Sequence, residues 1–315
     1  MPNQSSLWNS GHVTPLQKIE NPLLQLHALQ LYVKRDDLLH PHVSGNKWRK
    51  LKYNFLEAQR LGFQTILTFG GAYSNHIAAT AAAGKATGIQ TVGIIRGDEL
   101  TPQSNQTLAL AQANGMKLIF VTREQYQDKD ALAQIYGQNC YLMPEGGSNA
   151  LAAKGVAEVV SEINAQLGRA PTYLTAAVGT GSTFAGLCRG AKQSSTQVLG
   201  FAALKNGQYL LPKIQDWAET PPKENLTDAI FWDACGPGYG KTTPDLQQFM
   251  RDFEQQTGIL LDPVYTAKMS FKLYQLIESG AYFPANATIV ALHTGGLQGR
   301  TPKLLGNISD AVCVL

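Results

Sequence analysis

The sequence is poor in cysteine, with only four in 315 residues, at Cys140, Cys188, Cys235 and Cys313. They are far apart, and their spacing lacks the close pairs that bind zinc, exchange electrons or build a disulfide framework. We therefore expect buried thiols in a protein of a reducing compartment.

Long apolar runs and blocks of like charge are missing as well. No stretch approaches the roughly 18 consecutive apolar residues of a membrane-spanning helix, and residues 1–17 lack the apolar core of a signal peptide. Charged residues make up 16% of the chain and its net charge is only +3. Without a basic tract or patch, the sequence predicts no nucleic-acid partner, no membrane partner, a small-molecule ligand and a cytoplasmic location.

What the chain does have is an apolar fraction of 44% and enough length for two domains with separate cores. Short β-rich runs alternate with helical stretches such as 75–87, 101–114 and 184–192, which is typical of parallel sheets covered by helices. The sequence predicts an α/β fold with two open, twisted, mostly parallel sheets. Each sheet belongs to its own domain, and the active site is expected in the cleft between them.

The predicted strands fall into two groups. The first group covers 65–69, 91–96, 117–122 and 140–144, and the second covers 31–35, 172–178, 198–203, 230–234 and 288–292. The second group begins before the first and continues after it. We therefore expect residues 1–50 and 151–315 to form a large cofactor-binding domain and residues 51–150 a small α/β domain. The polar, proline-containing stretch 206–223 is expected to be a surface excursion.

Lys47 stands where an extended segment runs into a helix. The partial positive charge of a helix N-terminus disfavours an ammonium group, and Arg49 and Lys50 add like charge nearby. Both effects lower the pKa of Lys47 and favour the free amine that attacks a carbonyl carbon. The alternative is that Lys47, Arg49 and Lys50 form an ordinary solvated helix face.

A glycine-rich turn, Gly179-Thr180-Gly181-Ser182-Thr183, follows an apolar strand and precedes a helix. Converging N–H groups, the helix dipole and the hydroxyls make this turn a candidate phosphate site. It lacks the third glycine of a dinucleotide fingerprint and the Gly-Lys-Ser/Thr ending of a nucleotide P-loop, so it suits a monophosphate. The alternative is a tight turn without a ligand.

A second turn, 70–76, also lies between a strand and a helix. Its N–H groups and the Ser74 hydroxyl could hold a substrate carboxylate, Asn75 could bond a ring hydroxyl, and His76 could bind or relay a proton. A lone histidine at a helix start is more often structural. Two weaker candidates are the hydroxyl of Thr294 at a strand end and the phenol of Tyr265, whose plain interpretation is a buried, hydrogen-bonded tyrosine.

A reactive lysine, a monophosphate site and a carboxylate site on a two-domain α/β scaffold together describe pyridoxal 5'-phosphate acting on an amino acid. Nearly end to end, the sequence resembles the pyridoxal-phosphate enzymes of the tryptophan synthase β type (fold type II). Within them it resembles the group of 1-aminocyclopropane-1-carboxylate deaminase and D-cysteine desulfhydrase. The matching motifs are Lys34-Arg35-Asp36-Asp37, Ser44-Gly45-Asn46-Lys47-Trp48-Arg49-Lys50-Leu51, Gly70-Gly71-Ala72-Tyr73-Ser74-Asn75-His76, Gly146-Gly147-Ser148-Asn149-Ala150, Gly179-Thr180-Gly181-Ser182-Thr183, Gly238-Tyr239-Gly240, Asp262-Pro263-Val264-Tyr265-Thr266 and His293-Thr294-Gly295-Gly296.

For the cofactor, the resemblance implies that Lys47 forms an imine with its aldehyde. It also implies that Lys50 and the 179–183 turn hold the phosphate and that Asn75 contacts the ring hydroxyl. At the ring nitrogen the deaminases carry a glutamate where this chain has Thr266, and an apolar residue where it has Thr294. Two neutral hydroxyls there match the desulfhydrases and imply a weaker electron sink.

For the substrate, the resemblance implies that Ser74 and His76, with Asn75, meet the carboxylate and that Tyr239 and Tyr265 line the pocket. A weaker sink suits α-proton removal followed by loss of a good β-leaving group. The sequence thus predicts a homodimeric lyase that eliminates sulfide from D-cysteine or a related β-substituted amino acid. Lys47 is the first candidate for the proton carrier, before Ser74 and Tyr265. The alternatives are a cyclopropane deaminase, another amino-acid enzyme of this fold, a cofactor- or amino-acid-binding protein without turnover, or a phosphate-ligand binding protein that forms no imine.

Overall fold

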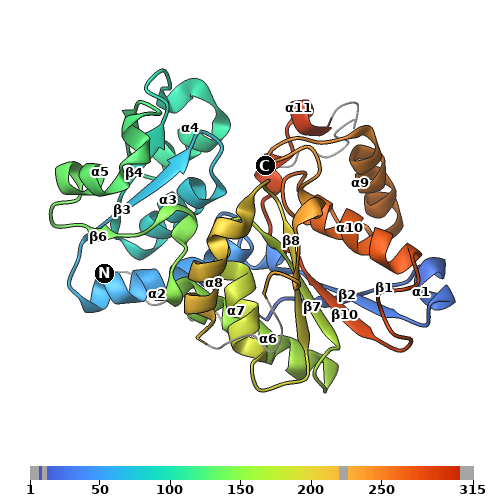
Figure 1. Cartoon of the computed structure of the whole chain (residues 1–315). Coiled ribbons are helices and arrows are strands. Elements are labelled where there is room, and N and C mark those ends of the chain that lie inside the picture. Colours follow the sequence, from blue (N-terminus) through green and yellow to red (C-terminus); the bar gives the residue numbers. More distant parts are fainter. Residues whose placement is uncertain (1–6, 9–12, 220–225, 306–315) are drawn as a thin grey trace.

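The computed structural model describes residues 7–8, 13–219 and 226–305 and shows two α/β units side by side (Figure 1). The larger unit has a six-stranded sheet in the order β1 (Leu16–Ile19), β2 (Gln30–Lys34), β10 (Thr288–Leu292), β7 (Tyr173–Val178), β8 (Gln197–Ala202) and β9 (Ile230–Phe231). The smaller unit has a four-stranded sheet in the order β5 (Lys117–Val121), β4 (Gln90–Arg96), β3 (Thr65–Gly71) and β6 (Tyr141–Leu142). Only the edge pair β1 and β2 is antiparallel within the described chain, so the predicted fold class is confirmed.

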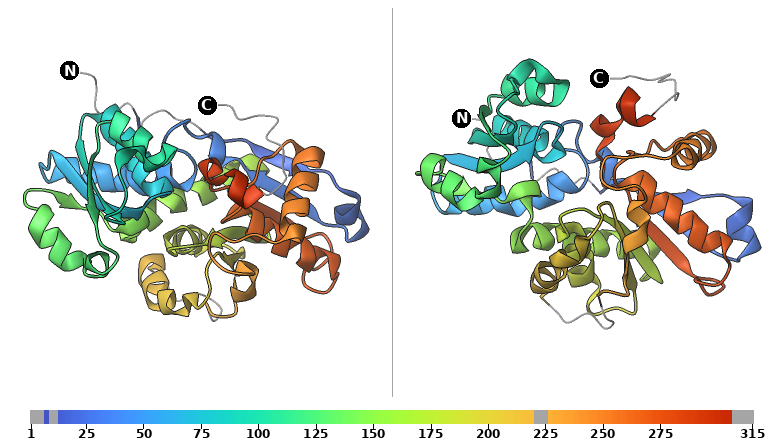
Figure 2. Two further views of the ribbon diagram at one scale, coloured as in Figure 1. Left: turned by 90° about the horizontal axis from the view of Figure 1, so that it is seen from above. Right: turned by 45° about the horizontal axis from the view of Figure 1, so that its top comes forward.

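Helices cover the faces of these sheets, as the three views show (Figures 1 and 2). The helices of the described chain are α1 (Pro22–Leu26), α2 (Asn46–Arg60), α3 (Asn75–Thr87), α4 (Gln106–Ala113), α5 (Lys129–Tyr136), α6 (Ala150–Leu167), α7 (Ser182–Ala191), α8 (Leu211–Ala218), α9 (Pro244–Thr257), α10 (Thr266–Glu278) and α11 (Pro302–Leu305). Short 3₁₀ turns at Glu145–Gly147 (η4), Trp232–Cys235 (η6) and Leu297–Gly299 (η7) complete the connections used below.

The central strand β7 shows why both faces of the large sheet are covered. Its six residues are all buried, and their side chains alternate between two cores. Tyr173 and Ala177 join the core beneath α9 and α10, whereas Leu174 and Ala176 join the core beneath α6 and α7. The continuous apolar run of β7 is therefore explained by burial on both faces of the sheet, which is usual for parallel strands.

Several predicted elements are shorter than the sequence suggested. The expected helix at 101–114 is a 3₁₀ turn followed by α4, because Asn105 adopts extended backbone angles and caps α4 through its side chain. The strands expected at 140–144 and 230–234 shrink to the two-residue β6 and β9. The antiparallel edge strand β1 was not predicted at all.

Strand order explains where a ligand site can form. Along the chain β3, β4 and β5 run in one direction across the small sheet, and β6 returns to the other side of β3. In the large sheet β7, β8 and β9 run in one direction, and β10 lies on the other side of β7. Such reversals open a crevice at the carboxyl ends of the strands. The loops that follow β3, β7 and β10 contain predicted site residues, and the loop after β6 contains one of the motifs that carry the family resemblance.

The division into residues 1–50 with 151–315 and residues 51–150 stays a proposal. Position 50 lies inside α2, which runs unbroken to Arg60 and packs Leu51 and Phe55 against the core of β3 and α3. The helix also contacts α6 of the larger unit through Arg49 and Glu162. We propose that α2 connects the two units and carries the residues of the site between them.

Two further expectations are corrected or limited. Residues 220–223 lie outside the described chain, but 211–218 form α8, whose Ile214 is fully buried against the core of α7. This stretch is therefore not the surface excursion that we expected. Cys235 is buried, Cys140 and Cys188 are half-buried, and Cys313 lies outside the described residues. Within the described ranges, no helix is long and apolar enough to cross a membrane.

Candidate active site

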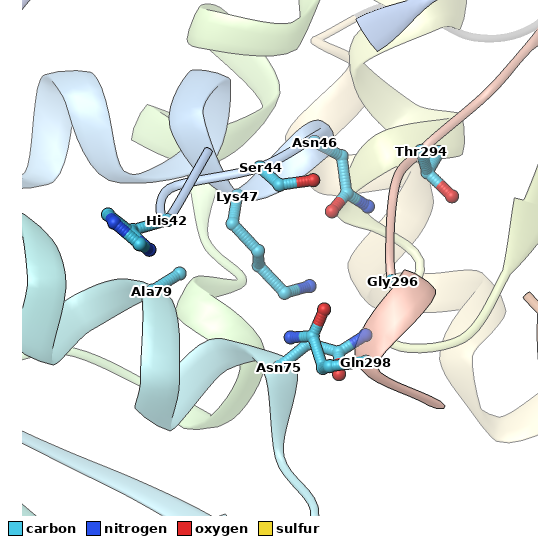
Figure 3. Close-up of a pocket in the computed structure, with 9 residues that line it drawn as sticks. All are labelled: His42, Ser44, Asn46, Lys47, Asn75, Ala79, Thr294, Gly296 and Gln298. Atoms are coloured by element: carbon cyan, nitrogen blue, oxygen red, sulfur yellow. The ribbon is translucent and has the colours of Figure 1, made fainter. Parts of the chain in front are cut away.

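Lys47 is the second residue of α2, and its side chain extends into a small pocket between the two units (Figure 3). The pocket is lined from α2 and its preceding loop, from α3, and from the loop after β10. Its lining residues are His42, Ser44, Asn46, Lys47, Asn75, Ala79, Thr294, Gly296 and Gln298. In Figure 3 the amine points toward the side chains of Asn75 and Gln298. Among the described residues it has no hydrogen-bond partner.

Gly45 holds this pocket together by a close backbone contact. It caps α2 with φ 62° and ψ −142°, a conformation that only glycine adopts readily. A Cβ atom at this position would lie 1.9 Å from the carbonyl oxygen of Thr294. The N–H of Asn46 donates to the same carbonyl at 3.2 Å. The start of α2 and the loop after β10 are thus fixed against each other, and Lys47 follows directly.

Burial lowers the pKa of Lys47 to about 8, while the carboxylate of Asp262 opposes this shift. The direction agrees with the sequence prediction, but the cause differs. Arg49 points away and forms buried ion pairs with Asp36 at 2.6 Å and Glu162 at 2.7 Å. Its charge is neutralised, so it does not act on Lys47, and desolvation is the dominant effect.

Asp262 is a site residue to which the sequence analysis gave no role. Its buried carboxylate accepts the backbone N–H groups of Val264, Tyr265 and Thr266 at 2.8–2.9 Å and the hydroxyl of Thr266 at 2.9 Å. One side chain therefore fixes the start of α10 and places a negative charge near Lys47. Burial raises the pKa of Asp262, and these hydrogen bonds oppose the rise. An acid just before a helix is a capping signal that could have indicated this role.

Lys50 lies one turn along α2 from Lys47 and faces the turn after β7. Its amine donates to the hydroxyl of Ser148 at 2.9 Å and approaches that of Thr180 at 3.4 Å. Ser148 in turn contacts Thr180 at 2.5 Å and accepts from Ser182 at 3.0 Å. One amine and three hydroxyls from α2, the loop after β6 and the turn after β7 therefore converge.

This cluster fits a phosphate group. The side chain of Lys50 is 1% exposed, and within the described chain it has no carboxylate within ion-pair distance. Burial and the nearby Lys47 hold its pKa well below the usual range, which an anion at this place would relieve. Gly181 precedes α7 with φ 91°, and α7 has no side-chain cap, so its first N–H groups are free for an anion.

Ser148, like Asp262, belongs to a motif noted in the sequence but had no predicted role. Its position after two glycines in a strand-to-helix loop could have indicated an anion-binding role. Of the predicted phosphate residues, Thr183 lies slightly apart, since its hydroxyl accepts from the Asn46 side chain at 2.9 Å. Gly179 leaves room for Tyr265, because a Cβ atom there would lie 2.9 Å from that ring.

The turn after β3 leads into α3 and keeps anion-binding groups at the helix start. Ser74 caps α3 by accepting the N–H of Ile77 at 3.3 Å, which leaves the Ser74 hydroxyl proton free to donate. The N–H groups of Asn75 and His76 belong to the first turn, where no intrahelical acceptor exists. The His76 ring is buried and contacts the hydroxyls of Thr68 at 2.7 Å and Thr80 at 3.5 Å. The main-chain N–H of His76, rather than its ring, is therefore available to a carboxylate.

Tyr239 and Tyr265, the two tyrosines predicted to line the substrate pocket, contact each other in the larger unit. The hydroxyl groups of Tyr239 and Tyr265 are 2.9 Å apart, and their rings pack edge to face with centroids 5.9 Å apart. Burial and the neighbouring phenol raise the pKa of Tyr265 well above its ordinary value. Tyr265 is therefore a neutral hydrogen-bonding group at ordinary pH.

The two threonines predicted at the cofactor ring differ in their surroundings. Thr266 is fully buried, and its hydroxyl donates to the carboxylate of Asp262. The same hydroxyl oxygen accepts the backbone N–H of Asp262 at 2.8 Å. Thr294 lines the pocket, and in the described part of the chain its hydroxyl has no hydrogen-bond partner. His42 and Gln298 line the same pocket, and no sequence pattern marked either of them.

Comparisons with known proteins agree with this geometry. The family model described as "Pyridoxal-phosphate dependent enzyme" matches residues 8–295. The D-cysteine desulfhydrase of Klebsiella pneumoniae is 33% identical, over 91% of this chain and 92% of its own length. The mitochondrial bifunctional D-cysteine desulfhydrase/1-aminocyclopropane-1-carboxylate deaminase of Arabidopsis thaliana is 29% identical, over 98% of this chain and 84% of its own. A crystal structure of an ACC deaminase homologue superimposes with a TM-score of 0.78 at 25% identity, covering 95% of this chain and 96% of the other.

Proposed function

Because the chain belongs to the family of pyridoxal-phosphate dependent enzymes, with pyridoxal 5'-phosphate as its cofactor, we propose that it is a lyase acting on D-cysteine or a related β-substituted amino acid. Its membership of the ACC deaminase and D-cysteine desulfhydrase group confirms the resemblance inferred from the motifs. The choice of reaction within that group is our proposal.

The observation that carries the proposal is the pairing of two amines on one face of α2. Lys47 supplies a nucleophile that burial brings to a pKa of about 8, and Lys50 supplies a buried counter-charge for a phosphate. The two residues are three positions apart, so they lie on neighbouring points of one helix face. Lys50 would thus hold the phosphate of the cofactor, and Lys47 would supply the amine that bonds to its aldehyde. When bound, pyridoxal phosphate withdraws electrons from the α-carbon of the amino acid.

The chain's own groups would then orient the substrate. The N–H groups at the start of α3 and the Ser74 hydroxyl would hold its carboxylate, and Asn75 would bond the ring hydroxyl beside it. Tyr265, which the raised pKa keeps neutral, and its partner Tyr239 would line the substrate's side of the site. The amine of Lys47, when it is not bonded to the cofactor, would carry the α-proton of the substrate. Ser74 and Tyr265 are the second candidates for that step.

The pair Thr266 and Thr294 supports elimination over cyclopropane opening. Both side chains are neutral, so neither would keep a ring nitrogen protonated as a glutamate does. Thr266 also lies against the buried carboxylate of Asp262, which leaves little tolerance for a second acid at that position. A weak electron sink suffices when the β-substituent is a good leaving group such as thiolate.

The proposed reaction converts D-cysteine and water into pyruvate, ammonia and hydrogen sulfide. The purified holoenzyme should release sulfide and pyruvate in equal amounts from D-cysteine, with L-cysteine and aminocyclopropane carboxylate as comparisons. Ketobutyrate from the cyclopropane, with no sulfide from either cysteine, would show that the protein is a deaminase instead. A spectral response to amino acids without any product would favour a binding protein.

Two further features remain proposals. Free thiols at Cys140, Cys188 and Cys235 support a reducing compartment, and we propose the cytoplasm. A homodimer is proposed from the family resemblance. Sedimentation of the holoenzyme would test the second proposal, with a monomer as the contradicting result.

A further inference from the structure

Lys268 is a buried lysine that the proposed reaction does not use. It lies in the first turn of α10, three residues after Tyr265, and is 3% exposed. Its amine donates to two backbone carbonyls, those of Cys235 at 2.9 Å and Gly238 at 2.5 Å. Among the described residues no carboxylate forms an ion pair with it. Burying an amine costs desolvation free energy. A buried lysine whose amine bonds only two backbone carbonyls therefore indicates a specific structural role.

One carbonyl belongs to Cys235, the last residue of η6, and the other to Gly238 in the glycine-rich loop that follows η6. Gly236, Gly238 and Gly240 all have positive φ values, of 55°, 121° and 64°. Three glycines in five residues leave the free chain with high conformational entropy, which must be overcome to fix the loop. The Lys268 ammonium bonds the residue that precedes this loop, Cys235, and a residue within it, Gly238, and so joins the loop to α10.

Tyr239 is the residue that this loop presents. It is 58% exposed, so packing alone does not fix it, yet its hydroxyl meets that of Tyr265 at 2.9 Å. Tyr265 is the N-cap residue of α10 and Lys268 lies in the first turn of this helix, so one helix fixes both partners. Tyr265 is placed directly, and Tyr239 is placed through the bonds from Lys268 to the loop.

We propose that Lys268 is a positioning residue whose buried ammonium clamps the Gly236–Gly240 loop and thereby holds Tyr239 against Tyr265 at the substrate pocket. The consequence for substrate binding rests on the proposed function, in which both tyrosines line that pocket. The clamp itself does not depend on the reaction. Without the clamp Tyr239 would sample many positions, and KM would rise while kcat and cofactor affinity changed little.

The clamp can be tested without turnover by measuring amide hydrogen exchange in the peptide that covers 232–243. Lys268→Met keeps the aliphatic stem and removes the donors. Lys272→Met is the matched control, since Lys272 lies on the same helix and pairs with Asp233, an exposed residue at the start of the same segment. We expect exchange to accelerate about tenfold in Lys268→Met and to stay near the wild-type rate in Lys272→Met. Wild-type protection in a folded Lys268→Met protein would overturn the proposal. Lys268→Gln, whose amide keeps a donor, replaces Lys268→Met if that variant does not fold, and intermediate exchange is then expected.

A double-mutant cycle tests the link to Tyr239. The ligand is D-alanine, which has no β-leaving group, and its affinity is read from the cofactor absorbance of the holoenzyme. Tyr239→Phe should weaken binding about three- to tenfold in the wild-type background, as the loss of one hydrogen bond predicts. In the Lys268→Met background the same change should weaken it less than about twofold, because Tyr239 is already displaced. Equal effects in both backgrounds would contradict positioning. If the wild-type protein responds to no amino acid, the proposed function fails, while hydrogen exchange still decides whether the clamp exists.

Discussion

The amine of Lys50 lies 2.9 Å from the hydroxyl of Ser148, although the two residues are 98 positions apart in the chain. This contact joins α2 to the loop after β6 and completes the group of donors that also includes Thr180 and Ser182. A phosphate at this place would be held from both α/β units at once. The cofactor would therefore join the units as well as supply the chemistry.

The first prediction concerns this anion site. Lys50→Met should weaken the binding of pyridoxal phosphate about 10- to 100-fold, since a charge-assisted hydrogen bond contributes about 1.5–3 kcal/mol. It should leave the binding of pyridoxal, which has no phosphate, nearly unchanged. Lys52→Met is the control, because Lys52 lies on the same helix but pairs with Glu158. Fluorescence titration of the apoprotein measures both affinities, and an equal loss for both ligands would count against the assignment.

The second prediction is the pH dependence of Lys47. Only the free amine attacks an aldehyde, and the pKa of Lys47 is lowered to about 8. Trapping of benzaldehyde on Lys47 by cyanoborohydride should therefore be small at low pH, rise through about pH 8 and level off above it. An ordinary lysine amine, with a pKa of about 10.4, would still be rising there. Mass spectrometry of the Lys47 peptide gives the profile, and a midpoint near pH 10 would disprove the perturbation.

The third prediction concerns Asp262. Because its charge raises the pKa of Lys47, Asp262→Asn should move the Lys47 trapping profile to lower pH. The same change would place the NH₂ group of an asparagine against backbone N–H groups at the start of α10, so hydrogen bonds would be lost there. We expect the free energy of unfolding to fall by about 3 kcal/mol, which corresponds to roughly two charge-assisted hydrogen bonds. Asp245→Asn, at the exposed start of α9, is the control. Denaturant unfolding gives the stability, and a profile shifted to higher pH would show that the electrostatic assignment is wrong.

The fourth prediction tests the contact between Gly45 and Thr294. Gly45→Ala forces a Cβ atom to within 1.9 Å of the Thr294 carbonyl oxygen, so the start of α2 must move or the protein must unfold. Gly62→Ala is the matched control, because Gly62 has φ 81° but no atom within 4 Å of its Cβ position. We expect a loss of about 1 kcal/mol in the control and more than about 3 kcal/mol at Gly45. Similar losses in thermal unfolding experiments would show that backbone strain, not the contact, dominates.

The sequence was sufficient for the fold class and for the residues that stand next to glycine-rich turns. Alternating strand and helix patterns predicted the parallel sheets, because such patterns depend on neighbours in sequence and can be found by reading the chain locally. The position of Lys47 at a helix start predicted the direction of its pKa shift, although burial in the folded chain causes that shift. The family resemblance then ordered the motifs into one site.

What the sequence did not reveal depends on contacts between distant segments. Arg49 was expected to act on Lys47, but Asp36, in the short turn after β2, and Glu162, in α6, neutralise its charge. Asp262, between α9 and α10, and Ser148, in the loop after β6, acquire their roles only when these distant segments meet α2 and the turn after β7. His76 looked available at a helix start, whereas Thr68 and Thr80 engage its ring within the smaller unit.

The central claim is that Lys47 is the amine that bonds to the cofactor. Reduction of the holoenzyme with borohydride, followed by peptide mapping, tests it most directly, with Lys47→Ala as the control. The account predicts one pyridoxyl group per chain, on Lys47, and none in the variant. A label on Lys50, or an unchanged amount of label in Lys47→Ala, would contradict it.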